Sequence, residues 1–322
     1  MRITINDRTV ETLQGETLLE ACRRVGIEVP SLCYAPNAVH KPSCMVCMVQ
    51  DLSTSQMIPS CSTYPVEGMR IDTESSLVVS LRKMALDLLL RDHRADCEAP
   101  CVTVCPHGLN IEGMLAAYDK EDYLRARKYL AAVFDLPSVA CEGCKAPCEK
   151  VCRRNSVDAH VEIRSIVNEL AAREDLPVQG DPADVQVQDK TRFSSRQGVF
   201  TEQEKIRLRA EQPLASNCLH CACAARNDCR LRDLASAAGI KTPRFGVSSA
   251  QPFKKRKHIT GDLWFEPAKC IHCGLCVYNT VDGFSFKGRG FTMQVDIPEA
   301  SYGNVSESLA GLCPTGALSL IR

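Results

Sequence analysis

Hydrophobic and polar residues alternate at the start of the chain, which predicts strands over residues 2–6 and 9–13 with a turn between them at residues 7–8. The spacing of apolar residues then changes to that of a helix. Thr17 can cap this helix, which we expect to run to about Val25. Residues 1 to about 90 are therefore expected to form a compact α/β unit.

Further along the chain, apolar residues recur at helical spacing in several segments. Helices are predicted over residues 77–91, 111–119, 122–132, 161–173, 201–211 and 231–238. A short strand is predicted at residues 318–321, and the glycine-containing segment 283–290 is interpreted as a hairpin.

Changes in composition divide the chain into segments. We expect domains over residues 1–93 and 94–173, a linker over 174–216, a short cysteine module over 217–240 and a last domain over 263–322. The linker is rich in Pro, Gly, Gln and Asp, and residues 241–262 form a second polar connection.

Charge and hydropathy argue against nucleic-acid binding, secretion and membrane insertion. The chain has 39 basic and 39 acidic residues, so no global charge favours nucleic acid. Its start lacks the pattern of a secretory signal, and charged residues interrupt the longest apolar stretch, near residues 77–90. We expect a soluble cytoplasmic protein without a membrane span.

The cysteines are the most informative residues about function, because 20 occur among 322 residues. In the cytoplasm many cysteines indicate metal or redox chemistry, and disulfides are the weaker alternative. Only Cys22 stands alone, on the apolar side of the first predicted helix, and a buried core role is expected for it. The others form five groups: Cys33, Cys44, Cys47, Cys61; Cys97, Cys101, Cys105; Cys141, Cys144, Cys148, Cys152; Cys218, Cys221, Cys223, Cys229; and Cys270, Cys273, Cys276, Cys313.

The first group offers four thiolates, three of them within one loop and Cys61 beyond it. A [2Fe–2S] cluster needs four cysteine ligands, so this group predicts one such cluster. Zinc is the alternative, although zinc sites usually pair two C-x2-C knuckles and only one is present here.

The second and third groups together offer seven thiolates, whereas two [4Fe–4S] clusters need eight ligands. His93 lies four positions before Cys97 and is the candidate for the eighth ligand. The alternative is a histidine at the end of a helix that faces solvent or the helix dipole. His107 and His160 fit no ligand spacing and are expected at the surface.

The fourth group packs four cysteines into twelve residues, which a loop around a [4Fe–4S] cluster would satisfy more easily than a regular helix or strand. A zinc knuckle remains open as the alternative. The last group contains the C-x2-C-x2-C half-motif of bacterial ferredoxins, closed by Cys313. Thr280 stands where a partner cluster would take its cysteine, so a single [4Fe–4S] cluster is predicted, and Gly274 lets the backbone approach it.

These motifs carry resemblances to known families. Segments 3–6, 16–21, 27–30, 32–34, 44–47, 58–61 and 67–69 resemble the N-terminal ferredoxin domain of the complex I large iron–sulfur subunit, which also occurs in NAD-linked formate dehydrogenases and [FeFe] hydrogenases. The segment Ser43-Cys44-Met45 departs from that family's usual Gly-x-Cys-Arg. Segments 284–291 and 313–318 resemble the C-terminal ferredoxin segment of formate dehydrogenase and complex I relatives.

Segments 99–106 and 148–155 resemble the twin-cluster domain of the glutamate synthase small subunit and of dihydropyrimidine dehydrogenase. That resemblance implies crossed ligand sets. One cluster would use Cys97, Cys101 and Cys152 with His93 as the possible fourth ligand. The other would use Cys105, Cys141, Cys144 and Cys148. Only the gap from His93 to Cys97 agrees with the complex I pattern His-x3-Cys-x2-Cys-x5-Cys.

The resemblances imply a modular α+β fold, with an N-terminal β-grasp [2Fe–2S] ferredoxin domain, a helical twin-[4Fe–4S] domain and C-terminal ferredoxin-like cluster modules. They also imply an electron-transfer subunit with one [2Fe–2S] and four [4Fe–4S] clusters. Its expected partners are a flavin/NAD(P)H subunit and a catalytic redox subunit such as a formate dehydrogenase or hydrogenase.

No catalytic residues are predicted, and no dinucleotide-binding glycine motif follows a strand and opens a helix. Two alternatives stay open at this point. One is a self-contained oxidoreductase that binds flavin, and the other is a zinc-binding regulatory protein.

Overall fold

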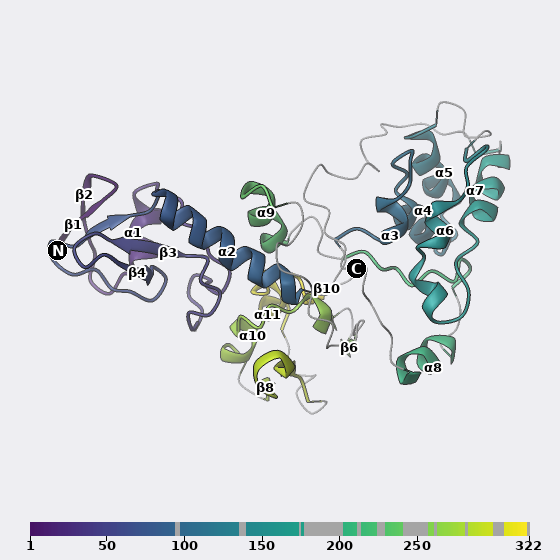
Figure 1. Ribbon diagram of the computed structural model, residues 1–322. Coiled ribbons are helices and arrows are strands. Elements are labelled where there is room, and N and C mark those ends of the chain that lie inside the picture. Colours follow the sequence, from purple (N-terminus) through teal and green to yellow (C-terminus); the bar gives the residue numbers. More distant parts are fainter. Residues whose placement is uncertain are drawn as a thin grey trace. The chain divides into compact units, whose positions relative to one another are not determined.

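The computed structural model describes residues 1–93, 97–134, 140–173, 175–176, 202–210, 214–223, 229–240, 257–260, 263–280, 283–298 and 306–320 (Figure 1). These residues form two compact units. The first unit contains residues 1–93, 229–240 and those from 257 onward, and the second contains those between 97 and 223.

The first unit begins with a five-stranded mixed sheet of order β2-β1-β5-β3-β4. Ile3 and Ile5 point into its core, as the alternation of the first strand predicts. The hairpin turn falls at Asn6 and Asp7, which both have positive φ, one residue earlier than expected. The strands are β1 (Arg2–Ile5), β2 (Arg8–Glu11), β3 (Met48–Asp51), β4 (Gln56–Pro59) and β5 (Arg70–Asp72).

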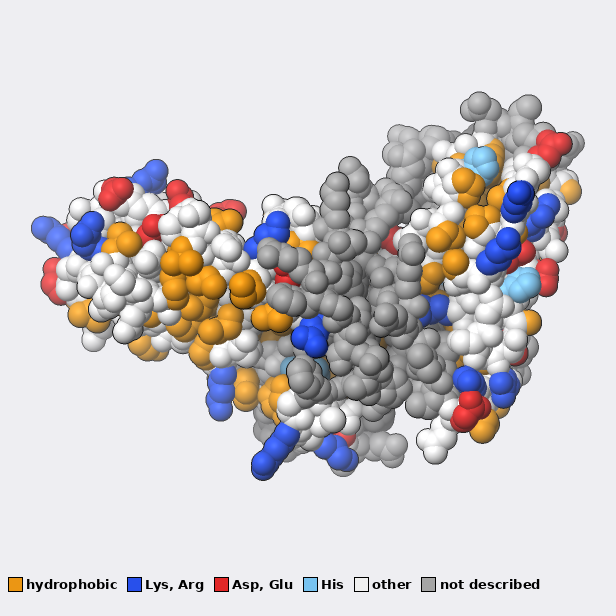
Figure 2. All heavy atoms as spheres, in the orientation of Figure 1, with side chains coloured by type: hydrophobic (Ala, Val, Ile, Leu, Met, Phe, Trp, Pro, Cys, Tyr) orange, Lys and Arg blue, Asp and Glu red, His pale blue; other side chains and the backbone are white. Residues whose placement is uncertain are grey.

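Two helices accompany this sheet. Helix α1 (Leu18–Arg24) begins at the predicted cap, where Thr17 and Glu20 form a reciprocal capping box. Helix α2 (Ser76–Asp92) is capped by Ser75 and buries Val78, among other residues, against the unit. The opposite side of α2 leaves large apolar side chains exposed, and hydrophobic side chains gather on this unit in Figure 2. The exposed apolar side chains of α2 are Leu77, Val79, Met84 and Leu88.

The remaining elements of the first unit come later in the chain, after the residues of the second unit. Helix α9 (Arg230–Ala237) contacts α2. A three-stranded antiparallel sheet of order β10-β7-β6 packs its apolar side with α11. The elements are β6 (Lys257–Thr260), β7 (Leu263–Phe265), η4 (Pro267–Lys269), α10 (Leu275–Tyr278), α11 (Glu307–Gly311) and β10 (Leu318–Leu320). The predicted hairpin is present as β8 (Ser285–Lys287) and β9 (Gln294–Asp296), joined through η5 (Gly290–Thr292).

The second unit is helical in the part of it that the structure describes. Its core contains Met114 and Leu115 of α4 with Leu130 of α5 and Val167 of α7. Helices α4 and α5 approach closely, since a Cβ on Gly113 would lie 2.7 Å from the Tyr129 ring. The helices are α3 (Pro100–Thr103), α4 (Ile111–Tyr118), α5 (Tyr123–Ala131), α6 (Pro147–Lys150), η2 (Arg153–Ser156), α7 (Ile163–Ala172) and α8 (Glu202–Ala210).

The mixed helix and sheet content of the expected α+β class is confirmed. Most of the predicted linker 174–216 lies outside the described residues, but its charged patch contains α8. The predicted module 217–240 is divided, because residues up to 223 belong to the second unit and those from 229 to the first. Among the described residues, no helix is both long and apolar enough to span a bilayer.

Candidate metal centres

The first cysteine group gathers at one end of the β3–β4 hairpin. Cys47 immediately precedes β3 and Cys61 follows β4, and the pairing of Met48 with Pro59 brings them together. The loop after α1 supplies Cys33 and Cys44. All four side chains are buried. We name this set the N-terminal site.

The sulfurs of the N-terminal site lie within hydrogen-bonding reach of one another. Interactions with the neighbouring Cys44 and Cys61 thiols hold the pKa of Cys33 well below its usual range. Interaction with Cys61 likewise lowers the pKa of Cys47 to about 7. The backbone amide of Ser43 donates to Cys33 Sγ at 3.5 Å. Converged sulfurs with an amide pointing at them are what a [2Fe–2S] cluster requires.

Tyr34 and His40, in the loop after α1, contact each other and residues at or near the N-terminal site. The Tyr34 hydroxyl donates to Glu20 Oε1 at 2.8 Å, and burial first, then this bond, raises the pKa of Tyr34 to about 12. The His40 ring packs edge-on against Tyr34 at 4.9 Å, and its Nε2 lies 2.9 Å from the Cys61 carbonyl oxygen.

The last cysteine group, Cys270, Cys273, Cys276 and Cys313, lines one small, mostly apolar cavity, and we name it the C-terminal site. Burial raises the pKa of Cys270 well above its usual range, and the charge of Cys313 raises it further. The amides of His272 and Leu318 donate to Cys270 Sγ and Cys313 Sγ at 3.4 and 3.5 Å. The predicted set of four ligands is therefore brought together.

Gly274 has the backbone conformation that its position in this site requires. Its φ is +80°, and a Cβ there would lie 2.4 Å from the Tyr278 ring. Gly274 is the N-cap of α10, so this conformation makes the turn into that helix. The approach of its backbone to a cluster stays a prediction.

In the second unit, Cys105, Cys141, Cys144 and Cys148 form one set, which we name the Cys105 site. Burial raises the pKa of Cys141 to about 11, and the neighbouring Cys144 and Cys105 add to the shift. Burial also raises the pKa of Cys148 to about 12, with smaller contributions from Glu149, Cys105 and Cys141. This is the grouping that the twin-cluster resemblance implies.

A second set in this unit joins cysteines from different predicted groups. Burial raises the pKa of Cys101, and the charges of Cys218, Cys221 and Cys152 contribute. Cys152, Cys218 and Cys221 also pack against the core cluster that contains Cys101. We name these four the Cys101 site. Spacing in the sequence had instead predicted one centre from Cys218 and Cys221 with the two cysteines that follow them.

Hydrogen bonds from α4 explain why Cys218 and Cys221 lie here. Asp119 accepts bonds from the Ser216 amide at 2.7 Å and the Ser216 hydroxyl at 2.8 Å, and His220 Nε2 lies 3.0 Å from its Oδ2. Glu112 Oε1 accepts from the Ala222 amide at 3.1 Å. Burial alone would raise the pKa of Asp119, but its bonds to His220 and Ser216 outweigh this and lower it.

A local signal marks Cys218-Leu219-His220-Cys221 as a cluster-binding loop. It has the same form as Cys270-Ile271-His272-Cys273 of the C-terminal site. Both histidines have positive φ, 46° and 53°, and both amides donate to the sulfur two residues earlier, at 3.3 and 3.4 Å. Comparison of the two segments could have revealed this from the sequence, whereas nothing local marked Asp119 or Glu112.

The remaining predicted ligands are His93, Cys97, Cys223 and Cys229, and all four are buried. His93 is the C-cap of α2 and is 3% exposed, so the solvent-facing alternative does not apply. Burial, and then the charge of Lys269, lowers the pKa of His93 to about 4. A neutral imidazole is the form that binds metals. Cys22 is packed in the core of the first unit, as expected.

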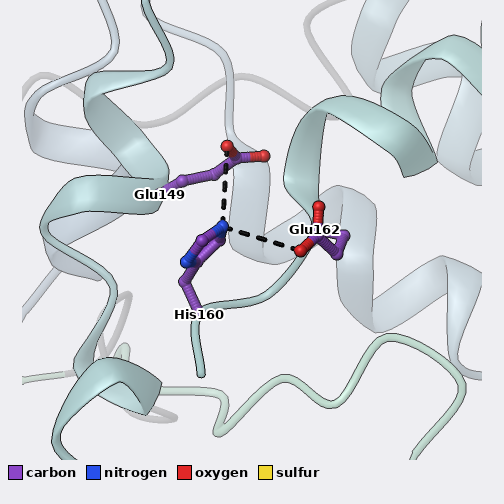
Figure 3. Close-up of side chains that lie close together, drawn as sticks. All are labelled: Glu149, His160 and Glu162. Atoms are coloured by element: carbon purple, nitrogen blue, oxygen red, sulfur yellow. Dashed lines mark ion pairs between the residues drawn. The ribbon is translucent and has the colours of Figure 1, made fainter.

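One cluster of side chains outside these sites also has metal-ligand chemistry (Figure 3). His160 Nε2 lies 3.9 Å from Glu149 Oε2 and 3.7 Å from Glu162 Oε1. Glu149 also accepts a bond from the Arg164 amide at 2.8 Å. The Glu162 side chain is 71% exposed, so the cluster is a set of surface ion pairs.

Two family models match the chain. Residues 1–76 match the 2Fe-2S iron-sulfur cluster binding domain, and residues 92–175 match dihydropyrimidine dehydrogenase domain II, 4Fe-4S cluster. A solved structure, of NAD+-reducing [NiFe]-hydrogenase in the H2-reduced state, aligns with 99% of this chain and 86% of its own, with a TM-score of 0.52 and 18% identity. That likeness concerns the fold.

Three curated relatives align with part of the chain. An NADH-quinone oxidoreductase component of Rhizobium meliloti (strain 1021) is 32% identical over 37% of this chain. NADP-reducing hydrogenase subunit HndD of Solidesulfovibrio fructosivorans is 36% identical over 30%. The NADH-ubiquinone oxidoreductase 75 kDa subunit of Reclinomonas americana is 32% identical over 30%. The matches span only 14% to 17% of the relatives' length. The protein therefore carries a 2Fe–2S and a 4Fe–4S domain and is related to iron–sulfur subunits of NADH dehydrogenases and hydrogenases.

Proposed function

We propose that this chain is a non-catalytic electron-transfer subunit with one [2Fe–2S] and four [4Fe–4S] clusters. The observation that carries the proposal is the convergence of cysteines from separate segments on four sites. In three of these, the N-terminal, C-terminal and Cys101 sites, a backbone amide donates to a cysteine sulfur. Such amide–sulfur bonds are typical of iron–sulfur sites and help to set their potentials.

Each proposed ligand set is one of the four sites in which the structure brings cysteine sulfurs together. The N-terminal site would hold the [2Fe–2S] cluster, and the C-terminal, Cys105 and Cys101 sites would each hold a [4Fe–4S] cluster. The fourth [4Fe–4S] cluster is proposed from the cysteine groups of the sequence alone. His93, Cys97, Cys223 and Cys229 are the predicted ligands outside the four sites, and they are not grouped into one set here.

The residues around the sites would hold the clusters and adjust their potentials. Bound iron–sulfur clusters supply one-electron redox chemistry. The chain holds the thiolates in place, directs amides toward sulfur and buries the sites among apolar side chains such as those around the C-terminal site. Burial, hydrogen bonding and nearby charges are the means by which a protein adjusts a cluster potential.

The partners are proposed from the relatives. Their names describe NADH- and NADP-linked oxidoreductases and a hydrogenase. We infer that this chain relays electrons between a flavin/NAD(P)H subunit and a redox enzyme such as a formate dehydrogenase or hydrogenase, in the cytoplasm. The missing dinucleotide motif supports a nucleotide-binding partner over a nucleotide site in this chain.

Anaerobic purification with metal and sulfide analysis tests this function. We expect two iron atoms from the N-terminal site and four from each other site, with matching sulfide, and reducible centres by electron paramagnetic resonance. Zinc without iron and sulfide would instead support the regulatory alternative. Flavin absorbance in the chain alone would support the self-contained oxidoreductase. Co-purification followed by mass spectrometry would identify the partner subunits.

A further inference from the structure

Arg230, the first residue of α9, contacts two different cysteine-bearing segments. Its backbone amide donates to the Pro314 carbonyl oxygen at 2.9 Å, and Pro314 directly follows Cys313 of the C-terminal site. The first amides of a helix have no partner within the helix, so this bond satisfies one of them. The start of α9 is thereby attached to the C-terminal site.

The Arg230 side chain reaches the N-terminal site. Its Nη2 donates to the Ser31 carbonyl oxygen at 2.6 Å, and its Nη1 donates to the Tyr34 carbonyl oxygen at 3.5 Å. These two carbonyl groups lie on either side of Cys33 in the chain. The planar fork of a guanidinium can hold two acceptors at once, which a lysine ammonium cannot do with the same geometry.

The charge of Arg230 acts on both sites. Burial lowers the pKa of Arg230 and so does nearby Arg23, while the thiolates of Cys44, Cys273 and Cys33 oppose the shift. Arginine stays protonated in proteins, so the guanidinium is a fixed positive charge. One partly buried cation is thus close enough to interact with sulfurs of both sites.

Independent contacts hold the same two segments together. The Val39 amide donates to Asn279 Oδ1 at 2.8 Å, and Asn279 Nδ2 donates to the Val39 carbonyl oxygen at 2.7 Å. The Lys41 ammonium lies 5.0 Å from the centre of the Tyr278 ring. Val39 and Lys41 belong to the loop between Cys33 and Cys44, and Asn279 follows α10. The two sites are therefore packed against each other inside the first unit.

We propose that Arg230 is a positioning residue that fixes the N-terminal site against the C-terminal site and places one shared positive charge beside both. The proposal rests on the proposed function, because it assumes that both sites hold iron–sulfur clusters. A reduced cluster is more negative than an oxidised one, so a nearby cation favours the reduced form and raises the potential. Removal of Arg230 should therefore lower the potentials of both sites together.

Redox titration of the anaerobically purified chain, followed by electron paramagnetic resonance, measures this effect. At a fixed solution potential, Arg230→Gln should lower the reduced-to-oxidised ratio about tenfold at both sites, a shift of about 59 mV for one electron. Arg230→Lys keeps the charge but loses the fork. Its potentials should stay near the wild-type values while backbone hydrogen exchange of residues 31–44 becomes faster.

Arg82 provides the matched control. It is also partly buried, and its Nε donates to the Met48 carbonyl oxygen at 2.8 Å. Of the two sites, only Cys47 of the N-terminal site contributes to its pKa. Arg82→Gln should therefore shift the N-terminal site alone.

The possible outcomes distinguish failure of the Arg230 proposal from failure of the proposed function. Unchanged potentials in Arg230→Gln with full iron content, or a shift at one site only, would overturn the proposal. If Arg230→Gln loses iron from both sites, Arg230→Lys decides: faster exchange with normal potentials supports the proposal, and wild-type exchange overturns it. A wild-type chain without iron and sulfide would defeat the proposed function instead.

Discussion

His220 Nε2 lies 3.0 Å from Asp119 Oδ2, so the last turn of α4 is tied to the loop that carries Cys218 and Cys221. The Asp119 side chain is only 5% exposed and also accepts two bonds from Ser216. Two cysteines beyond residues 92–175, which match the 4Fe-4S family model, are thereby attached to the helical unit.

Asp119→Asn should weaken this attachment by about 1–3 kcal/mol, because a buried charged acceptor of several hydrogen bonds is lost. Iron content should fall selectively at the Cys101 site, and hydrogen exchange of residues 214–223 should rise. Glu121→Gln, an exposed change in the same turn, is the control. Equal exchange in the two variants would contradict the role assigned to Asp119.

The same carboxylate predicts a pH dependence. The pKa of Asp119 is lowered in the folded chain, so its contribution is complete above the unfolded value of about 4 and is lost as the pH falls through the folded value. The exchange difference between wild type and Asp119→Asn should be constant near neutral pH and shrink below about pH 4. A difference that instead disappears between pH 6 and 8 would assign the effect to another group.

The proposed ligand sets can be separated by single cysteine variants. Cys218→Ala should remove the same paramagnetic signal as Cys101→Ala, whereas Cys229→Ala should remove a different one. Cys22→Ala is the control, because Cys22 lies in the core and should leave iron content unchanged. Loss of one common signal in Cys218→Ala and Cys229→Ala would restore the grouping by sequence proximity.

His93→Ala tests the only nitrogen ligand in the scheme. We expect loss or conversion of one [4Fe–4S] signal, since a missing ligand leaves a cluster corner open. His107→Ala, at a surface histidine, should change nothing. An unchanged spectrum and iron content in His93→Ala would remove His93 from the ligands.

Gly274→Ala should destabilise the C-terminal site, because the new Cβ would clash with the Tyr278 ring in a backbone conformation that favours glycine. We expect a cost of about 1–3 kcal/mol and reduced iron at this site. Gly311→Ala is the control, since it lies at the end of α11 with open space around it and should be neutral or slightly stabilising. Equal behaviour of the two variants would contradict the steric argument.

Local signals in the sequence predicted local structure well. Thr17 caps α1 as predicted, and the predicted helices 111–119 and 122–132 are present as α4 and α5, with Asn110 and Asp122 as their caps. The first hairpin turn shifted by one residue, because Asn6 and Asp7 both tolerate the left-handed conformation that a tight turn needs.

The grouping of cysteines was harder to predict, because it depends on contacts between distant segments. Spacing alone assigned Cys218 to its neighbours in the chain. Its actual surroundings depend on Glu112 of α4 and on Asp119, the C-cap of α4, and no motif marks either residue. Arg230 is a similar case, since its two sets of acceptors lie far from it in the sequence.

The docking of residues 216–222 on α4 also bears on biosynthesis. If Cys218 and Cys221 complete the Cys101 site, the ribosome must translate well past the last helix of the bundle before that centre can be loaded. The N-terminal site, by contrast, has all its sulfurs once Cys61 has emerged. The sulfurs of the four sites therefore become available in chain order, and those of the C-terminal site, which needs Cys313, come last.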